Sequence, residues 1–324
     1  HNAIDAGLRV EGNNNLIKDN TIENTLFGID VHEGDSNILR RNDISSKDMP
    51  LELKGDSIRL WYSHFNRVED NFIHGTRDFA VWYSHDNTIS GNRIYGTRYG
   101  VHFMYAHHNN VEKNDIADCV VGLFLMYSND LTITGNKLLR SWGASGMGIG
   151  MKESSGVVAA NNEIMGNAVG IFLDLSPYDP DATNQFERNQ VAYNGTGVEF
   201  SADWESNVFR NNSFNTNFTQ IAVRGNGTAM RETWEQNYWD DFTGFDEDHD
   251  GKGDSPFEIY SYADRLWMEN REANFFRGGF ALEALDFIER LAPFSEPRLL
   301  MREQNPLVQP PVMAEAEKKK PTDA

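Results

Sequence analysis

The sequence predicts an all-β protein, a single-stranded right-handed parallel β-helix of about ten coils. One observation is an asparagine followed two residues later by an apolar residue, which recurs at intervals of 21 to 29 residues. The other is the alternation of apolar and polar residues in segments such as 170–175 and 197–200, which indicates strands with one buried face. The repeating asparagines are Asn20, Asn42, Asn71, Asn92, Asn114, Asn136, Asn162, Asn189, Asn212 and Asn237. Residues 1–240 therefore form the expected solenoid.

The asparagines and glycines of the repeat have a physical explanation. Asparagine tolerates the left-handed backbone that tight bends need, and its amide can bond the asparagine one coil away. Glycine, which often stands eight residues after the asparagine, would serve the same bends without a Cβ penalty. These glycines are Gly28, Gly100, Gly122, Gly170 and Gly197.

Composition restricts the function. The 324 residues include 29 Lys and Arg against 49 Asp and Glu, a net charge of −20, which disfavours nucleic acid and anionic lipid and suits cationic partners. No apolar run approaches the length that spans a bilayer. The first residue is His1 and the repeat is running by Asn15, so we expect the solenoid to be N-terminally truncated, with further coils and a signal peptide missing. The one cysteine, Cys119, is expected to be a small buried residue.

Four consecutive coils, which end near Asn66, Asn87, Asn109 and Leu131, can be aligned by position. Three alternate positions are apolar or aromatic in each coil, so we expect them to point inward, with the tyrosines stacked in a ladder. These residues are Ile58, Leu60, Tyr62, Phe79, Val81, Tyr83, Val101, Phe103, Tyr105, Leu123, Leu125 and Tyr127.

The intervening positions of these coils must then point outward. They place His102 beside Met104, and Met104 about 5 Å from Met126 across the strands. Thioether and imidazole suit copper(I), so these three residues are candidate ligands. A second candidate stack lies in the next turn and consists of His64, His85 and His107. The alternative is that the outward Trp and Met residues pack beneath a loop or a partner, and that the histidines only form turns.

Residues 241–300 break the repeat. Asp246, Asp248 and Asp250 precede a glycine with the spacing of a calcium loop, and Asp254 follows. Phe257 stands where an EF-hand has its glutamate, so we expect a short calcium-binding loop, with a solvated acidic turn as the alternative.

The segment from Arg277 to Pro293 has the pattern of an amphipathic helix. It either caps the solenoid or docks on a partner, and the residues expected to dock are Phe276, Leu285 and Ile288. Residues 301–324, with a proline pair and a lysine run, are expected to be a disordered tail.

The C-terminal motifs resemble those of the NosD family. The segments that carry the resemblance are 237–242, the Asp-rich loop, 260–267 and 282–297. The resemblance implies a periplasmic, non-enzymatic accessory protein for assembling the copper centre of nitrous oxide reductase. It also implies that the protein handles copper with an ABC-type complex of an ATPase and a membrane permease, and with a copper chaperone.

Two other function classes remain open. One is a scaffold that binds only proteins. The other is a carbohydrate-active β-helix (lyase, epimerase or glycosidase), which needs converging carboxylates or a carboxylate with a base. Outward-facing Trp61 and Trp82 could stack on sugar rings in such an enzyme. The available acids are Asp174, Asp179, Asp181 and Asp203, but they form no compact catalytic motif.

Overall fold

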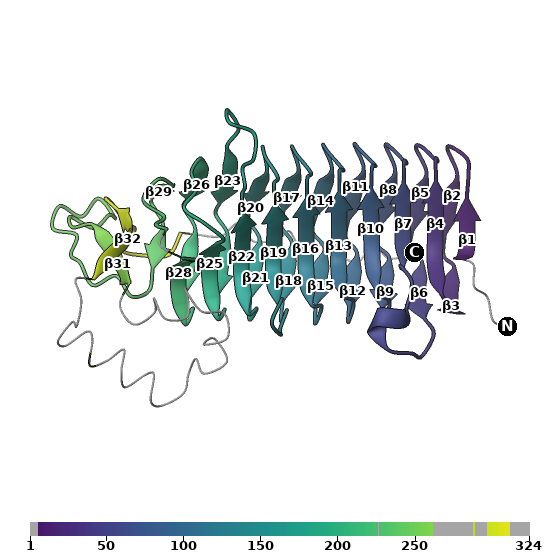
Figure 1. Ribbon diagram of the computed structural model, residues 1–324, viewed down its shortest axis with the longest axis horizontal. Helices are drawn as coiled ribbons and strands as arrows, with labels where there is room; N and C mark the ends of the chain where they lie inside the picture. The colour runs from purple at the N-terminus through teal and green to yellow at the C-terminus, as the bar shows by residue number, and fades with distance from the viewer. Residues whose placement is uncertain (1–5, 226, 262–287, 289–296, 312–324) are drawn as a thin grey trace.

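The computed structural model describes residues 6–225, 227–261, 288 and 297–311. It is a rod of three ten-stranded parallel sheets (Figure 1). Each coil contributes one strand to each sheet, and within these three sheets each strand pairs with the strand three strands further along the chain. The predicted right-handed parallel β-helix of about ten coils is therefore confirmed. No helix among the described residues has the length and apolar character needed to span a membrane.

The strands of each sheet follow one another along the rod. Sheet A comprises β1 (Ala6–Val10), β4 (Phe27–His32), β7 (Ile58–Trp61), β10 (Asp78–Trp82), β13 (Tyr99–Met104), β16 (Val121–Met126), β19 (Met147–Lys152), β22 (Val169–Asp174), β25 (Thr196–Phe200) and β28 (Thr219–Val223). Sheet B comprises β2 (Leu16–Lys18), β5 (Ile38–Arg40), β8 (Arg67–Glu69), β11 (Thr88–Ser90), β14 (Asn110–Glu112), β17 (Thr132–Thr134), β20 (Val158–Ala160), β23 (Asn184–Glu187), β26 (Asn207–Arg210) and β29 (Thr233–Glu235). Sheet C comprises β3 (Thr21–Thr25), β6 (Asp43–Ser46), β9 (Phe72–His74), β12 (Arg93–Tyr95), β15 (Asp115–Ala117), β18 (Lys137–Leu139), β21 (Glu163–Met165), β24 (Gln190–Ala192), β27 (Ser213–Asn215) and β30 (Tyr238–Trp239).

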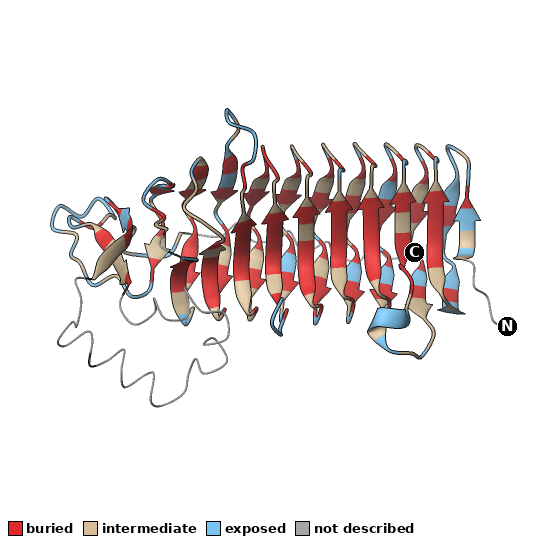
Figure 2. Ribbon diagram, in the orientation of Figure 1, coloured by how far each residue is buried: buried red, intermediate tan, exposed pale blue. Residues whose placement is uncertain are grey.

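The core lies between the three sheets (Figure 2). Sheet A holds the longest strands, so it presents the widest outer face, and the outward side chains of neighbouring strands lie one strand spacing apart. A 3-10 turn, η1 (Leu51–Leu53), lies in one insertion between coils. Cys119 is buried, as expected.

The repeating asparagines form a continuous hydrogen-bonded ladder, as expected, and they are buried from Asn42 onward. Asn92 illustrates each rung, since its backbone N–H and its Nδ2 both donate to Oδ1 of Asn114, at 2.9 Å each. The expectation about backbone conformation was wrong by one position, because the left-handed residue precedes the asparagine, as Gly91 and Lys113 do. The asparagine is therefore required for its hydrogen bonds rather than for its φ angle.

The repeating glycines also have a different reason from the predicted one. Gly28 and Gly100 do not have positive φ angles. A Cβ at Gly28 would lie 2.2 Å from the carbonyl oxygen of Ser57, and one at Gly100 would lie 2.4 Å from that of Gly122. Glycine is thus needed because neighbouring coils approach too closely for any side chain.

The tyrosines stack as predicted, but they do not point inward. Successive rings of Tyr62, Tyr83, Tyr105 and Tyr127 lie 5.0, 5.4 and 4.9 Å apart. Tyr62 is 47% exposed and Tyr105 42% exposed. All four have positive φ, because the strand ends one residue earlier and the alternation of faces ends with it. The other residues predicted to point inward are buried.

The last coil is closed by a segment far away in sequence. Strand β32 (Arg298–Glu303) pairs antiparallel with β31 (Phe257–Ser261). The Glu303 carboxylate ends the asparagine ladder, since it accepts the backbone N–H of Asn237 at 2.7 Å and the indole N–H of Trp239 at 2.7 Å. Residues 301–311 are thus structured, and the expectation of a disordered tail from residue 301 was wrong. Residues 312–324 lie outside the described part of the chain.

Candidate copper site

The candidate ligands lie on the outer face of sheet A. Met104 and Met126 are directly paired across β13 and β16, in a column that continues to Trp82 on β10 and Trp61 on β7. His102 lies in the adjacent column of β13. Strand alternation alone fixes these positions, because the neighbouring core residues on β13 and β16 occupy the opposite face. The two methionines are half-buried.

The His102 ring contacts side chains of both neighbouring coils. Its Nε2 lies 3.3 Å from Sδ of Met126, and its Nδ1 lies 3.4 Å from the indole Nε1 of Trp82. Trp82, Met104 and Met126 are successive rungs of one column, so the two nitrogens of His102 face this column on either side of Met104. The sequence therefore placed the three candidate ligands correctly on one face, and the structure brings His102 against Met126.

Aromatic rings enclose the imidazole. The centroids of Tyr99, Trp82 and Phe124 lie 4.9, 5.8 and 5.8 Å from that of His102. Only 7% of His102 is exposed, although an open ladder was expected. Burial lowers the pKa of His102 to about 4, against a smaller opposing effect of the Asp78 carboxylate. The imidazole is therefore neutral at pH 7, which is the form that binds metals.

The spacing of nitrogen and sulfur suits a shared metal. In zinc sites, imidazole nitrogen and sulfur lie about 2.0 and 2.3 Å from the ion, so two such ligands at a tetrahedral angle are about 3.5 Å apart. The 3.3 Å between Nε2 of His102 and Sδ of Met126 is close to this value. Imidazole and thioether are soft enough to favour copper(I) over hard cations.

The second candidate group, the histidine stack of His64, His85 and His107, occupies the turn after sheet A. Adjacent rings lie 5.1 Å apart in both pairs. Each Nδ1 accepts a backbone N–H from the next coil, with donors at His85, His107 and Asn129 and distances of 3.0, 2.9 and 3.0 Å. At the equivalent positions of other coils, the side-chain oxygens of Asp35 and Asn129 likewise accept a backbone N–H from the next coil.

These hydrogen bonds decide what the stack can do chemically. A ring nitrogen that accepts a hydrogen bond carries no proton, so in a neutral ring the proton is on Nε2. Binding a metal through Nε2 would move that proton to Nδ1, where it would face a backbone N–H that cannot turn away. His64, His85 and His107 therefore hold coils together, and their geometry favours a structural role over copper binding.

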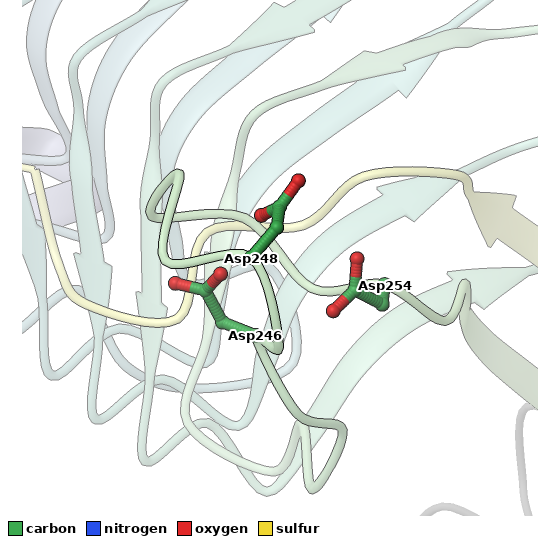
Figure 3. Close-up of side chains that lie close together, drawn as sticks. All are labelled: Asp246, Asp248 and Asp254. Carbon is green, nitrogen blue, oxygen red and sulfur yellow. The ribbon is translucent and has the colours of Figure 1, made fainter.

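The Asp-rich loop brings three carboxylates together at the C-terminal end of the rod (Figure 3). Oxygens of Asp246, Asp248 and Asp254 all lie within 4.8 Å of one another. Asp250 is not part of this group, and its Oδ1 accepts the backbone N–H of Lys252 at 2.8 Å. Carboxylate oxygens are ligands that calcium prefers.

The other candidate residues stay apart or lie outside the described chain. Phe276 and Leu285 are outside it, whereas Ile288 is helical and 48% exposed. The acids considered for sugar chemistry have separate partners: Asp174 accepts the hydroxyl of Ser201, Asp179 accepts the amide of Asn129, Asp203 accepts the backbone N–H of Thr228, and Asp181 is exposed.

Sequence reasoning missed the surroundings of His102. The sequence predicts Trp82 only as an outward-facing aromatic residue, and its repeat pattern does not indicate that Tyr99 lies beside His102. A signal existed for Phe124, because it aligns with His102 in one outward column. No sequence signal shows that the His102 ring leans into the neighbouring column, because this depends on its side-chain rotamer.

Comparisons with known proteins identify the family of the chain. The family model described as "Periplasmic copper-binding protein (NosD)" matches residues 44–244. The chain is 29% identical over 180 residues to "Probable ABC transporter binding protein NosD" of Pseudomonas aeruginosa, covering 51% of this chain and 40% of that protein. It is 27% identical over 132 residues to the protein of the same description from Stutzerimonas stutzeri, covering 40% of this chain and 28% of that one.

Among solved structures, the A-module of the mannuronan C-5 epimerase AlgE6 of Azotobacter vinelandii is similar, with a TM-score of 0.55 and 15% identity over 70% of this chain and 65% of that one. This likeness is one of fold alone. The chain spans less than half the length of the two curated relatives. Because the NosD model covers well over half of the chain, including all of the candidate copper ligands, the protein belongs to the NosD family of periplasmic copper-binding proteins.

Proposed function

We propose that this protein binds copper(I) through His102, Met104 and Met126 and hands it on, as a non-enzymatic accessory protein in assembling the copper centre of nitrous oxide reductase. The observation that carries the proposal is the neutral, enclosed imidazole whose Nε2 lies 3.3 Å from the Met126 thioether. Met104 occupies the paired position on the neighbouring strand. Copper here is cargo, and the half-buried Met104 and Met126 on the outer face are the ligands that a partner could reach.

The proposed partners follow from the family. The relatives are described as probable ABC transporter binding proteins. We propose accordingly that this protein works with an ABC-type ATPase and permease, a copper chaperone and the reductase itself. The segment that contains Phe276, Leu285 and Ile288 is the proposed docking element, which Leu285→Asp with Ile288→Asp would test by pull-down. A scaffold that binds only proteins is the alternative, and it would carry no metal.

The test is a titration of copper(I) against a competing chelator. Met104→Ala with Met126→Ala should weaken binding by at least about 100-fold, since every tenfold corresponds to about 1.4 kcal/mol and two ligands are lost. A matched control is Met165→Ala, which removes an outward methionine of sheet C. Equal affinity of the double variant and the wild type would contradict the methionine site.

We also propose that the Asp-rich loop binds calcium through Asp246, Asp248 and Asp254. The support is the sequence spacing together with the convergence of the three carboxylates. The loop also contacts the segment that closes the rod, since the backbone N–H of Gly253 donates to the carbonyl of Pro306 at 2.8 Å. Calcium would thus stabilise the closed end.

A further inference from the structure

We infer that Trp82 gates the copper site: its indole N–H holds His102 in the tautomer that cannot bind a metal through Nε2, and copper(I) binds when this hydrogen bond opens. The inference rests on the proposed copper function. It assigns a positioning role to Trp82, which lies one coil away from Met104 and in the same column.

The tautomer follows from the donors around the ring. The indole Nε1 of Trp82 can only donate, so Nδ1 of His102, 3.4 Å away, accepts and carries no proton. An imidazole whose Nδ1 accepts a hydrogen bond has only one proton, which is then on Nε2 and faces Sδ of Met126 at 3.3 Å. A thioether is a weak acceptor, so this second contact holds the proton only weakly.

Binding requires a change of tautomer. Copper(I) needs the lone pair of Nε2, so the proton on Nε2 leaves to solvent and another binds at Nδ1, which leaves the charge of the ring unchanged. The new Nδ1–H would face the indole N–H of Trp82, and two donors cannot share a hydrogen bond. The indole must therefore turn away from His102 when the ion binds.

The donor to His102 belongs to a side chain rather than to the backbone. The indole is half-buried on the outer face, and it meets Trp61 edge-on with centroids 5.8 Å apart. In the histidine stack, by contrast, the donor at the same ring atom is a backbone N–H at 2.9 to 3.0 Å, which is fixed by the coil. Of these four described histidines, His102 alone has a donor that a side-chain rotation can remove.

The experiment compares Trp82→Phe with Trp61→Phe in copper(I) titrations against a competing chelator. Trp82→Phe keeps a ring but removes the donor, so it should bind copper(I) roughly three- to tenfold more tightly, the factor that one hydrogen bond is typically worth. Trp61→Phe changes the neighbouring rung of the same column and should leave the affinity unchanged.

A spectroscopic measurement separates gating from a general effect on packing. In protein with ¹⁵N-labelled histidine, Nδ1 of His102 should appear unprotonated without metal and protonated with copper(I). A Trp82→Phe variant that binds as the wild type does or more weakly, or an Nδ1 that is protonated without metal, would overturn the gate. If His102→Ala binds copper(I) as tightly as the wild type, or the wild type binds none, the proposed copper site fails and the gate fails with it.

Discussion

His85 and His102 lie on neighbouring coils, and each accepts a hydrogen bond through Nδ1. The donor to His85 is the backbone N–H of His107, at 2.9 Å. The donor to His102 is the indole of Trp82, at 3.4 Å, and the other nitrogen of His102 faces a thioether. The comparison teaches that residue type and proximity do not make a histidine a metal ligand. The hydrogen-bond partner of each ring nitrogen determines whether that histidine can bind a metal.

Removing His85 tests the structural half of this comparison and should have the largest effect on stability. His85→Ala leaves the backbone N–H of His107 without its acceptor, which should lower the free energy of unfolding by about 1 to 3 kcal/mol. His85→Asn should restore most of the loss, because Asn129 has the same role two coils further on. Denaturant unfolding measures both variants, and copper(I) affinity should stay at the wild-type value. A loss of copper binding in His85→Asn would mean that the stack holds the ion.

Lowering the pH should also weaken the histidine stack, with a smaller effect on the free energy of unfolding than the removal of His85. Burial lowers the pKa of His85 and of His107 below the usual value of 6.5. The unfolded chain therefore binds these protons more readily, so the free energy of unfolding contributed by the stack is present at pH 7.5 and falls as the pH drops below about 6.5. Glu232 and Glu303 act in the opposite direction, since burial raises the pKa of each to about 7 and the fold retains their protons.

The measurement must isolate the histidine contribution from that of the glutamates. Comparing wild type with His85→Asn at pH 7.5 and 5.5 does so, because both proteins contain the same glutamates. The wild type should lose more stability than the variant between these two pH values. Equal losses would show that protons do not disrupt the stack.

Calcium should distinguish the carboxylate loop from the copper site. Its expected effect on stability is the smallest of these predictions. Millimolar calcium should raise the melting temperature by roughly 2 to 4 °C, because a ligand that binds only the folded state stabilises it. Asp246→Asn with Asp248→Asn should abolish the rise, and the His102→Ala variant should retain it. An unchanged melting temperature in the wild type would show that the three carboxylates form only an acidic turn.

The asparagine repeat and strand alternation were enough to predict the coils, the core and the pairing of Met104 with Met126. They failed where a strand ends, as at Tyr62, because the alternation of faces stops when φ becomes positive. They also could not show that Glu303 closes the ladder, because 66 residues separate it from Asn237 and no period connects them. The contacts of His102 depended on its rotamer, which periodicity does not determine.

The most direct test of the central claim is X-ray absorption at the copper edge of the protein loaded with one copper(I) ion. The proposed site predicts sulfur scatterers at about 2.3 Å together with one imidazole at about 2.0 Å, as for such ligands in other metal sites. In the His102→Ala variant the imidazole signal should disappear while the sulfur signal stays. A wild-type spectrum of several imidazoles without sulfur would contradict the site at His102, Met104 and Met126.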